Sequence, residues 1–244
     1  MPRPQFLPLR VDGRLQAVAV RVNETYSASA MVVSSSENIR YLTGFTGSAG
    51  VLICRTDDSV LVTDGRYVEQ AQIQIRDSGA QVRIFEARTA VETVDAMVSE
   101  LTHNATCLCE ASDLSVESLA RYEAALGRQL IPVTGVVEEL RRTKSEAEVE
   151  RIAFAAETAD SALAEVQVLL VRSMSELITE RDVRDELEYR MRRHGADGPS
   201  YETIVAAGNN AARPHHRPTE QRIREGDCVV IDDGGLVDGY HSDM

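Results

Sequence analysis

The segment Cys228-Val-Val-Ile-Asp-Asp-Gly-Gly-Leu-Val-Asp-Gly-Tyr-His-Ser-Asp-Met244 decides how the rest of the chain is organised. Its apolar beginning, Cys228 to Ile231, is typical of a β-strand, and the glycines and aspartates that follow are typical of a tight turn. A second short strand is expected from about Tyr240. The segment is therefore predicted to form a β-hairpin.

Asp232 and Asp243 fall on one face of this hairpin in either register that the turn allows. If the turn is centred between Val237 and Asp238, the two aspartates lie directly opposite, with Cβ atoms about 5 Å apart. If Asp238-Gly239 forms the loop, they are diagonal neighbours on the same face, because strand side chains alternate with a period of two. Two like charges this close cost free energy unless a cation lies between them, which predicts a carboxylate metal site. An acidic, solvated turn is the alternative that the hairpin alone leaves open.

The composition limits the class of protein. The 244 residues are 43% hydrophobic and 27% charged, as expected for one large or two ordinary globular domains. A net charge of −13 argues against a nucleic-acid partner. No run approaches the roughly 18 apolar residues of a membrane helix, and the first ten residues carry prolines and charge where a signal peptide needs an apolar core. We therefore expect a cytoplasmic protein without a membrane partner.

Strand-like runs alternate with helical patterns through the first half of the chain, which favours an α/β layer with a largely parallel sheet. The expected strands are Ala30–Ser34, Gly50–Arg55, Ser59–Thr63, Gln81–Glu86, Thr106–Glu110 and Leu130–Val133, and the expected helices are Arg66–Ile75, Ala90–Leu101 and Val116–Leu126.

The pattern changes after Gly135. A capping box, Thr143-Lys-Ser-Glu146, predicts the start of a long helix that runs to about Val171. A second helix is expected from Thr179 to His194, followed by a strand from Tyr201 to Ala207. These patterns predict two domains, residues 1–135 and 136–244.

Two further motifs carry candidate functional side chains. In Pro214-His-His-Arg-Pro218 the prolines restrict the backbone around His215 and His216, and the hairpin begins about ten residues later. A histidine and two aspartates in one pocket would suit metal-assisted hydrolysis, whereas surface histidines in a loop are the alternative. In the strand-to-helix turn Thr63-Asp-Gly-Arg-Tyr67, Arg66 either points into a cleft or covers the helix start.

Together these motifs resemble the family of Xaa-Pro aminopeptidases, prolidases and creatinases. The N-terminal domain of that family is matched by Asn38-Ile-Arg-Tyr-Leu-Thr-Gly-Phe-Thr-Gly-Ser-Ala-Gly50 and Thr63-Asp-Gly-Arg-Tyr-Val-Glu-Gln-Ala71. The first half of its catalytic domain is matched by Leu140-Arg-Arg-Thr-Lys-Ser-Glu146, Thr203-Ile-Val-Ala-Ala-Gly208, Pro214-His215, Ile231-Asp-Asp-Gly234 and Tyr240-His-Ser-Asp243.

The resemblance implies a fold and an activity. It implies a creatinase-like α/β N-terminal domain followed by an α+β catalytic domain of the pita-bread fold. The implied cofactors are two divalent metal ions, manganese first and cobalt or zinc as alternatives, and a hydroxide that bridges them attacks the peptide bond before proline. The implied substrate is a peptide with proline in second position, and the implied assembly is a homodimer supported by the N-terminal domain.

The resemblance also implies roles for individual residues. Asp232 matches the ligand of one metal ion and Asp243 the ligand that bridges both. His215 matches a histidine that contacts the substrate and steadies the reaction intermediate. His216 is expected to line the same pocket, and Arg66 is expected to contact one end of the substrate.

Two departures from the family pattern modify these expectations. Asp233 stands where many relatives have an apolar or aromatic residue. The family's downstream histidine and two glutamates do not occur before Met244, so the catalytic domain is expected to be incomplete and the chain alone to have little or no peptidase activity. The alternatives to an Xaa-Pro aminopeptidase are an Xaa-Pro dipeptidase, a creatinase-like C–N hydrolase without metal, and a non-catalytic peptide-binding or dimerisation module.

Overall fold

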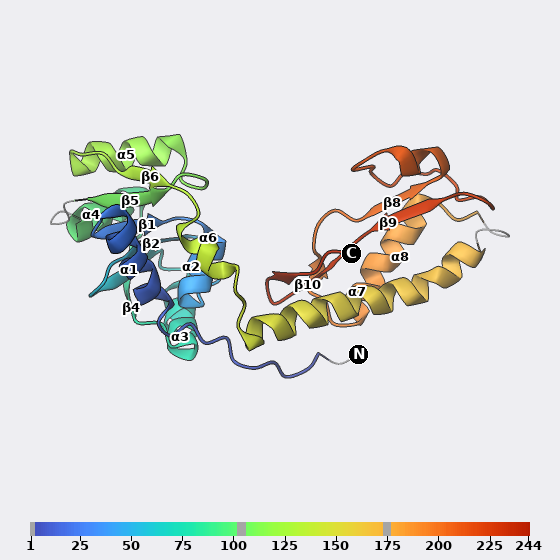
Figure 1. Cartoon of the computed structure of the whole chain (residues 1–244), viewed down its shortest axis with the longest axis horizontal. Helices are drawn as coiled ribbons and strands as arrows, with labels where there is room; N and C mark the ends of the chain where they lie inside the picture. Colours follow the sequence, from blue (N-terminus) through green and yellow to red (C-terminus); the bar gives the residue numbers. More distant parts are fainter. Residues whose placement is uncertain (1–2, 102–105, 173–176) are drawn as a thin grey trace. The chain divides into compact units, whose positions relative to one another are not determined.

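The computed structural model describes residues 3–101, 106–172 and 177–244, and its contacts divide the chain into two units (Figure 1). The N-terminal unit is Pro8–Thr143, and the C-terminal unit is Lys144–Met244 together with Met1–Leu7. The domain limits 1–135 and 136–244 remain a prediction.

A six-stranded sheet forms the centre of the N-terminal unit, with the strand order β4-β3-β2-β1-β5-β6. The strands are β1 (Ala30–Val33), β2 (Gly50–Cys54), β3 (Ser59–Thr63), β4 (Val82–Glu86), β5 (Cys107–Glu110) and β6 (Ile131–Val133). Neighbours pair in parallel except β1 with β2 and β2 with β3, so the sheet is mixed rather than largely parallel. The antiparallel pairing of β2 with β3 follows from their short connection, which can only turn the chain back on itself.

Helices cover both faces of this sheet (Figure 1). One face is covered by α1 (Arg14–Tyr26), α2 (Ser36–Thr43), α3 (Val68–Ser78) and α6 (Val136–Arg141), and the other by α4 (Ala90–Leu101) and α5 (Val116–Leu126). Because strand side chains alternate, Met31 and Val33 of β1 enter the first core, whereas Ala30 and Val32 enter the second. Burial of both faces explains why the inner strands β1 and β3 read as continuous, largely apolar runs.

Two helices pack on short strands in the C-terminal unit. The long helix α7 (Glu146–Arg172) contacts α8 (Glu180–Arg193), and their core includes Ala155, Ala159, Val183 and Leu187. The remaining elements are β7 (Gly198–Pro199), β8 (Ile204–Ala207), the 3₁₀ helix η1 (Gly208–Ala212), β9 (Val229–Asp232), β10 (Gly235–Val237) and β11 (Tyr240–His241).

The predicted long helix is present, but its capping box lies two residues later than expected. The Ser145 backbone N–H and hydroxyl donate to the Glu148 carboxylate at 2.9 and 3.0 Å, and the Glu148 N–H donates to the Ser145 hydroxyl at 3.4 Å. The Tyr240 hydroxyl also donates to Glu148, at 3.1 Å. The capping box is therefore formed by Ser145 and Glu148 and not by Thr143 and Glu146. Glu148 also joins the helix to β11 through its hydrogen bond with Tyr240.

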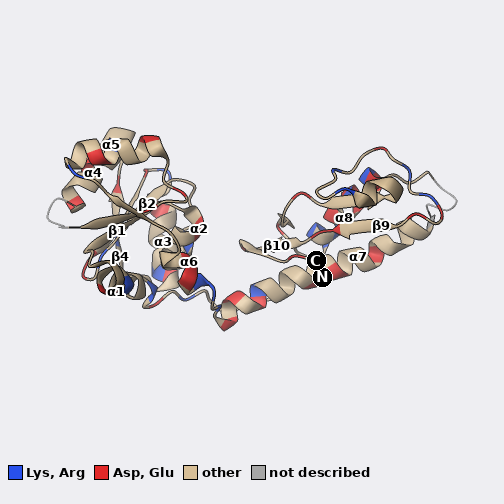
Figure 2. Cartoon of the chain, turned by 45° about the horizontal axis from the view of Figure 1, so that its top comes forward, with Lys and Arg blue, Asp and Glu red and all other residues tan. Residues whose placement is uncertain are grey.

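Charged residues of both signs are interspersed along the helices (Figure 2). On α8, for example, Glu180 and Asp182 lie in the first turn and arginines lie in the last, an order that suits the helix dipole. In this view the Lys and Arg positions of the described residues occur along the ribbon of both units. None of the helices in the described ranges is long and apolar enough to cross a membrane.

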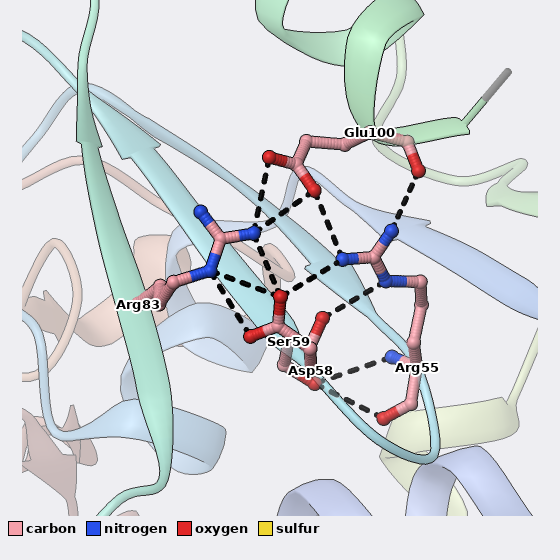
Figure 3. Close-up of polar contacts among 5 residues, drawn as sticks. All are labelled: Arg55, Asp58, Ser59, Arg83 and Glu100. Atoms are coloured by element: carbon pink, nitrogen blue, oxygen red, sulfur yellow. Dashed lines mark hydrogen bonds and ion pairs between the residues drawn. The ribbon is translucent and has the colours of Figure 1, made fainter.

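An ion-pair network ties together the β2–β3 turn, β4 and the end of α4 (Figure 3). Arg55 donates to the Glu100 carboxylate at 2.9 Å, and Arg83 donates to both Asp58 and Glu100, at 2.7 and 3.1 Å. The Arg55 and Glu100 side chains are only 15% and 14% exposed. This pair is therefore shielded from water more than an ordinary surface pair is.

We predict that Glu100→Ala lowers the free energy of unfolding by about 1–3 kcal/mol, since it leaves the guanidinium groups of Arg55 and Arg83 with Asp58 as their one shared carboxylate in this network. Urea denaturation followed by circular dichroism measures this change. The control is Glu117→Ala, which removes the exposed Glu117–Arg121 pair on α5 and is expected to cost at most about 0.5 kcal/mol. Equal costs for the two variants would contradict the role assigned to the network.

Candidate metal and catalytic site

The hairpin at the end of the chain is formed by β10 and β11, with Asp238-Gly239 as its two-residue loop. Both loop residues have positive φ, 48° and 70°, as a type I′ turn requires. The predicted hairpin is thus present with β10 as its first strand, whereas β9, which contains most of the apolar run Cys228 to Ile231, pairs with β8. Residues 233–234 separate β9 from β10, and the two strands belong to different sheets.

This pairing decides between the two registers. Leu236 pairs with His241, and Asp233 exchanges both backbone hydrogen bonds with Met244, at 3.1 and 2.9 Å. Asp243 therefore lies opposite Gly234, and Asp232 is its diagonal neighbour on the same face. The register with directly opposed aspartates is excluded.

The Tyr201 hydroxyl connects the two aspartates. It lies 2.9 Å from Asp243 Oδ1 and 2.7 Å from the Asp233 carbonyl oxygen. The Asp232 carboxylate is near enough to raise the pKa of this hydroxyl. Burial, together with these two carboxylates, raises the pKa of Tyr201, so the phenol keeps its proton and acts as a donor. The structure thus brings the predicted metal ligands together around one hydroxyl group.

Asp233 points away from this group because neighbouring strand residues face opposite sides. Its residue is 1% exposed, and within the described ranges neither carboxylate oxygen has a hydrogen-bond partner. Burial, with smaller contributions from Asp232 and Asp160, raises the pKa of Asp233 to about 7. Asp233, which stands where many relatives have an apolar or aromatic residue, is therefore a buried carboxyl group on the opposite side of the strand from the candidate metal ligands.

His216 is held by the buried carboxylate of Glu180, the first residue of α8. Its Nε2 lies 2.9 Å from Glu180 Oε2, and the side chains are 7% and 0% exposed. Glu180 also accepts a hydrogen bond from the Ala207 N–H, at 2.8 Å. The motif of two histidines is therefore anchored at the end of β8 that carries Ala207.

His215 is exposed and has a φ of 55°. Positive φ is uncommon outside glycine, and strained residues concentrate at functional sites. Among the described residues, no hydrogen bond or ion pair joins His215 or His216 to Asp232 or Asp243. Asp232 pairs with Ile204, three residues and about 10 Å along β8 from Ala207.

Arg66 lies in the N-terminal unit, at the turn before α3. It is exposed and forms a two-point contact with Asp64, at 3.0 and 2.7 Å, and its guanidinium lies 5.3 Å from the centre of the Tyr67 ring. Its predicted contact with substrate stays a prediction.

The side chains of the candidate site are of the chemical type that binds a hard divalent cation. Asp232 and Asp243 supply carboxylate oxygens, which such ions prefer. Yet no group of three or more His, Cys, Asp and Glu side chains within the described ranges is placed to hold a metal ion. The remaining ligands would have to be water molecules or other side chains.

Sequence reasoning missed Tyr201 and Glu180. Tyr201 was assigned only as the start of a strand, and Glu180 follows Thr179, whose capping box with Asp182 explains an acidic first turn by itself. Nothing in the local pattern separates these residues from ordinary strand and helix-start positions, because their partners lie at least 27 residues away in sequence.

Two family models together match most of the chain. Residues 14–143 match the creatinase/prolidase N-terminal domain, and residues 150–244 match metallopeptidase family M24. Among curated proteins, an uncharacterized peptidase of Bacillus subtilis is 34% identical over 221 residues, which are 88% of this chain and 59% of the relative. The Xaa-Pro dipeptidase of Pyrococcus horikoshii is 28% identical over 225 residues, 89% and 59% of the two chains. The chain thus spans about three fifths of the length of these relatives.

Solved structures show the same similarity. The Xaa-Pro dipeptidase from Bacillus anthracis superposes with a TM-score of 0.87 at 28% identity, over 96% of this chain and 63% of the other. The prolidase from Pyrococcus horikoshii gives a TM-score of 0.80 at 26% identity, over 95% and 63%. The fold of both units is therefore that of the prolidase-type proteins.

We predict that Asp233→Asn stabilises the metal-free chain in a pH-dependent manner. The folded chain keeps the proton of Asp233 up to about pH 7, whereas the unfolded chain releases it near pH ~4. The wild type therefore loses stability as the pH rises through this window. The gain from Asp233→Asn should be small near pH ~4 and reach at most about 4 kcal/mol above pH ~7.

Urea denaturation between pH 4 and 8, with a chelator present, measures this gain. The matched control is Asp185→Asn on α8, whose side chain is 67% exposed and should give a small difference at every pH. A gain from Asp233→Asn that does not vary with pH would contradict the assignment.

Proposed function

Because this chain belongs to the creatinase/prolidase family of M24 metallopeptidases, we propose that it acts in metal-dependent cleavage of the bond between an N-terminal residue and proline. The observation that carries the proposal is the convergence of Asp232 and Asp243 on the Tyr201 hydroxyl. Two carboxylates held on one face, with a neutral donor between them, form a charge arrangement that a cation relieves.

Each candidate residue has a distinct role in this proposal. Asp232 and Asp243 would hold two divalent metal ions, manganese in the first place, which when bound lower the pKa of water and polarise the scissile carbonyl. Tyr201 orients the Asp243 carboxylate by donating to Oδ1. His215 would contact the substrate and donate to the charge that develops on the carbonyl oxygen, and His216 would line the same pocket.

The proposal extends to the context of the reaction. Arg66, on the surface of the N-terminal unit, would contact one end of the peptide. The protein would act as a homodimer in the cytoplasm, on peptides with proline in second position. These points rest on the family resemblance.

An Xaa-Pro dipeptidase is the second candidate. It is favoured by the names of the Pyrococcus horikoshii relative and of the Bacillus anthracis structure, both of which are Xaa-Pro dipeptidases. The two activities differ in whether the substrate ends at proline or continues beyond it. A creatinase-like reaction without metal is disfavoured because both carboxylates are present on one face of the terminal hairpin.

We predict that the chain binds Mn²⁺ through the two aspartates. Asp232→Asn and Asp243→Asn should each weaken the affinity at least about tenfold, since each removes a charged oxygen ligand. Isothermal titration calorimetry measures the affinity, and Asp185→Asn serves as the matched control on an exposed aspartate. Unchanged affinity in both site variants would refute the assigned ligands.

We predict that peptidase activity appears when further metal-binding side chains are supplied beside Asp232 and Asp243. The test protein is a chimera of this chain with the segment of the Bacillus anthracis enzyme that it does not cover. With Mn²⁺ the chimera should cleave Xaa-Pro peptides, and His215→Ala should lower kcat about a hundredfold. The 244-residue chain alone should show little turnover, because two carboxylates are too few for a dinuclear site.

Comparing Ala-Pro with Ala-Pro-Ala as substrates of the chimera separates dipeptidase from aminopeptidase activity. A folded chimera that binds these peptides without cleaving them would support a non-catalytic module instead. Robust turnover by the 244-residue chain alone would contradict the expectation of an incomplete site.

A further inference from the structure

Glu180 is a buried carboxylate at the start of α8 whose two oxygens accept five hydrogen bonds. Its residue is 0% exposed. One oxygen accepts from the Ala207 N–H at 2.8 Å and the Asn210 side chain at 3.0 Å. The other accepts from His216 Nε2 at 2.9 Å and from the Thr219 N–H and hydroxyl at 2.9 and 2.8 Å. A carboxylate in this setting is fully satisfied and needs no further partner.

These donors keep Glu180 ionised. Burial alone would raise the pKa of Glu180, but the hydrogen bonds from Ala207, His216, Asn210 and Thr219 outweigh it and lower the pKa to about 2. An ionised carboxylate can only accept hydrogen bonds. The nitrogen of His216 that faces it must therefore carry a proton.

This constraint fixes the state of the His216 ring. With a proton on Nε2, the neutral ring has its lone pair on Nδ1 and can only accept a hydrogen bond there. A carboxylate behind one ring nitrogen is also the arrangement that orients histidines in metal and catalytic sites.

The same carboxylate joins the two ends of the histidine loop, residues 208–218. Ala207 precedes the loop and Thr219 follows it, and both donate backbone N–H groups to Glu180. Gln221 reinforces this closure, since it donates to the Ala207 carbonyl at 2.8 Å and accepts from Asn210 at 2.9 Å. Without Glu180, five donor groups on four residues would lose a charged acceptor.

We propose that Glu180 is the positioning residue of the histidine loop, which it closes around His216 so that this ring stays in the Nε2–H tautomer and presents Nδ1 as an acceptor. The inference deepens the proposed function: while neutral, His216 would receive an N–H donor of the peptide and would not donate to a substrate carboxylate. His215, the preceding residue, is carried by the loop that Glu180 closes.

The tautomer can be observed directly in the 244-residue chain. Two-bond ¹H–¹⁵N correlation spectra of the histidine-labelled protein, recorded near pH ~8.5 where an ordinary histidine is neutral, distinguish the two tautomers. The His216 signals are assigned by their loss in His216→Gln. We expect the Nε2–H pattern, and the Nδ1–H pattern would overturn the proposal without any variant of Glu180.

Glu180→Gln tests the role of the carboxylate at nearly constant size. The amide offers one accepting and one donating group to five donors, so we expect the His216 tautomer to become mixed or reversed. The N–H groups of Ala207 and Thr219 should exchange with solvent at least about tenfold faster. A change in tautomer separates positioning from a purely structural role, which would alter exchange alone.

Glu202→Gln is the matched control. Glu202 lies 3.3 Å from Arg217 of the same loop, but these side chains are 60% and 81% exposed. The control should leave both the tautomer and the exchange rates unchanged. If Glu180→Gln behaves like Glu202→Gln, the proposal is wrong. Neither measurement uses catalysis, so a failure of the proposed function and a failure of this inference give different results.

Discussion

The candidate site of the C-terminal unit depends on the strand register that places two carboxylates on one face of the terminal hairpin. Asp232 and Asp243 are brought together by the register that Asp238-Gly239 imposes, and the only neutral donor that the structure places between them is the Tyr201 hydroxyl, among the residues it describes. Two neighbouring carboxylates lower the stability of a metal-free fold, but together they bind a cation more strongly than one carboxylate does. Glu148 caps α7 and accepts a hydrogen bond from Tyr240 of β11, so it also attaches this hairpin to α7.

Three buried carboxyl groups show how hydrogen bonding decides the charge of an acid. Glu180 accepts five hydrogen bonds, and its pKa falls to about 2. Asp233 accepts none within the described ranges, and burial raises its pKa to about 7. Burial also raises the pKa of Glu110, although Ser34, Ser35 and Asn38 donate to it. All three residues are at most 3% exposed, yet the pKa is lowered in one and raised in the other two, and the hydrogen-bond donors around Glu180 account for the direction of its shift.

Local pattern predicted much of the fold because local physics sets those features. Strands buried on both faces read as apolar runs, as Ala30–Val33 does, and amphipathic spacing gave the helices of both units. The predictions that failed depend on which residue or strand pairs with which. The capping box was placed at Thr143 because two overlapping sequences fit the same pattern, and the sheet was taken as largely parallel because strand direction depends on a neighbour that periodicity does not identify.

The sequence by itself determined the alternation of strands and helices, the shared face of Asp232 and Asp243, and the family resemblance, because these depend on residue order and on the period of two along a strand. Only the tertiary structure decided the diagonal register, the pairing of β9 with β8, and the places of Tyr201 and Glu180. These features depend on contacts between residues tens of positions apart. Their energies come from burial and hydrogen bonding that no local pattern records.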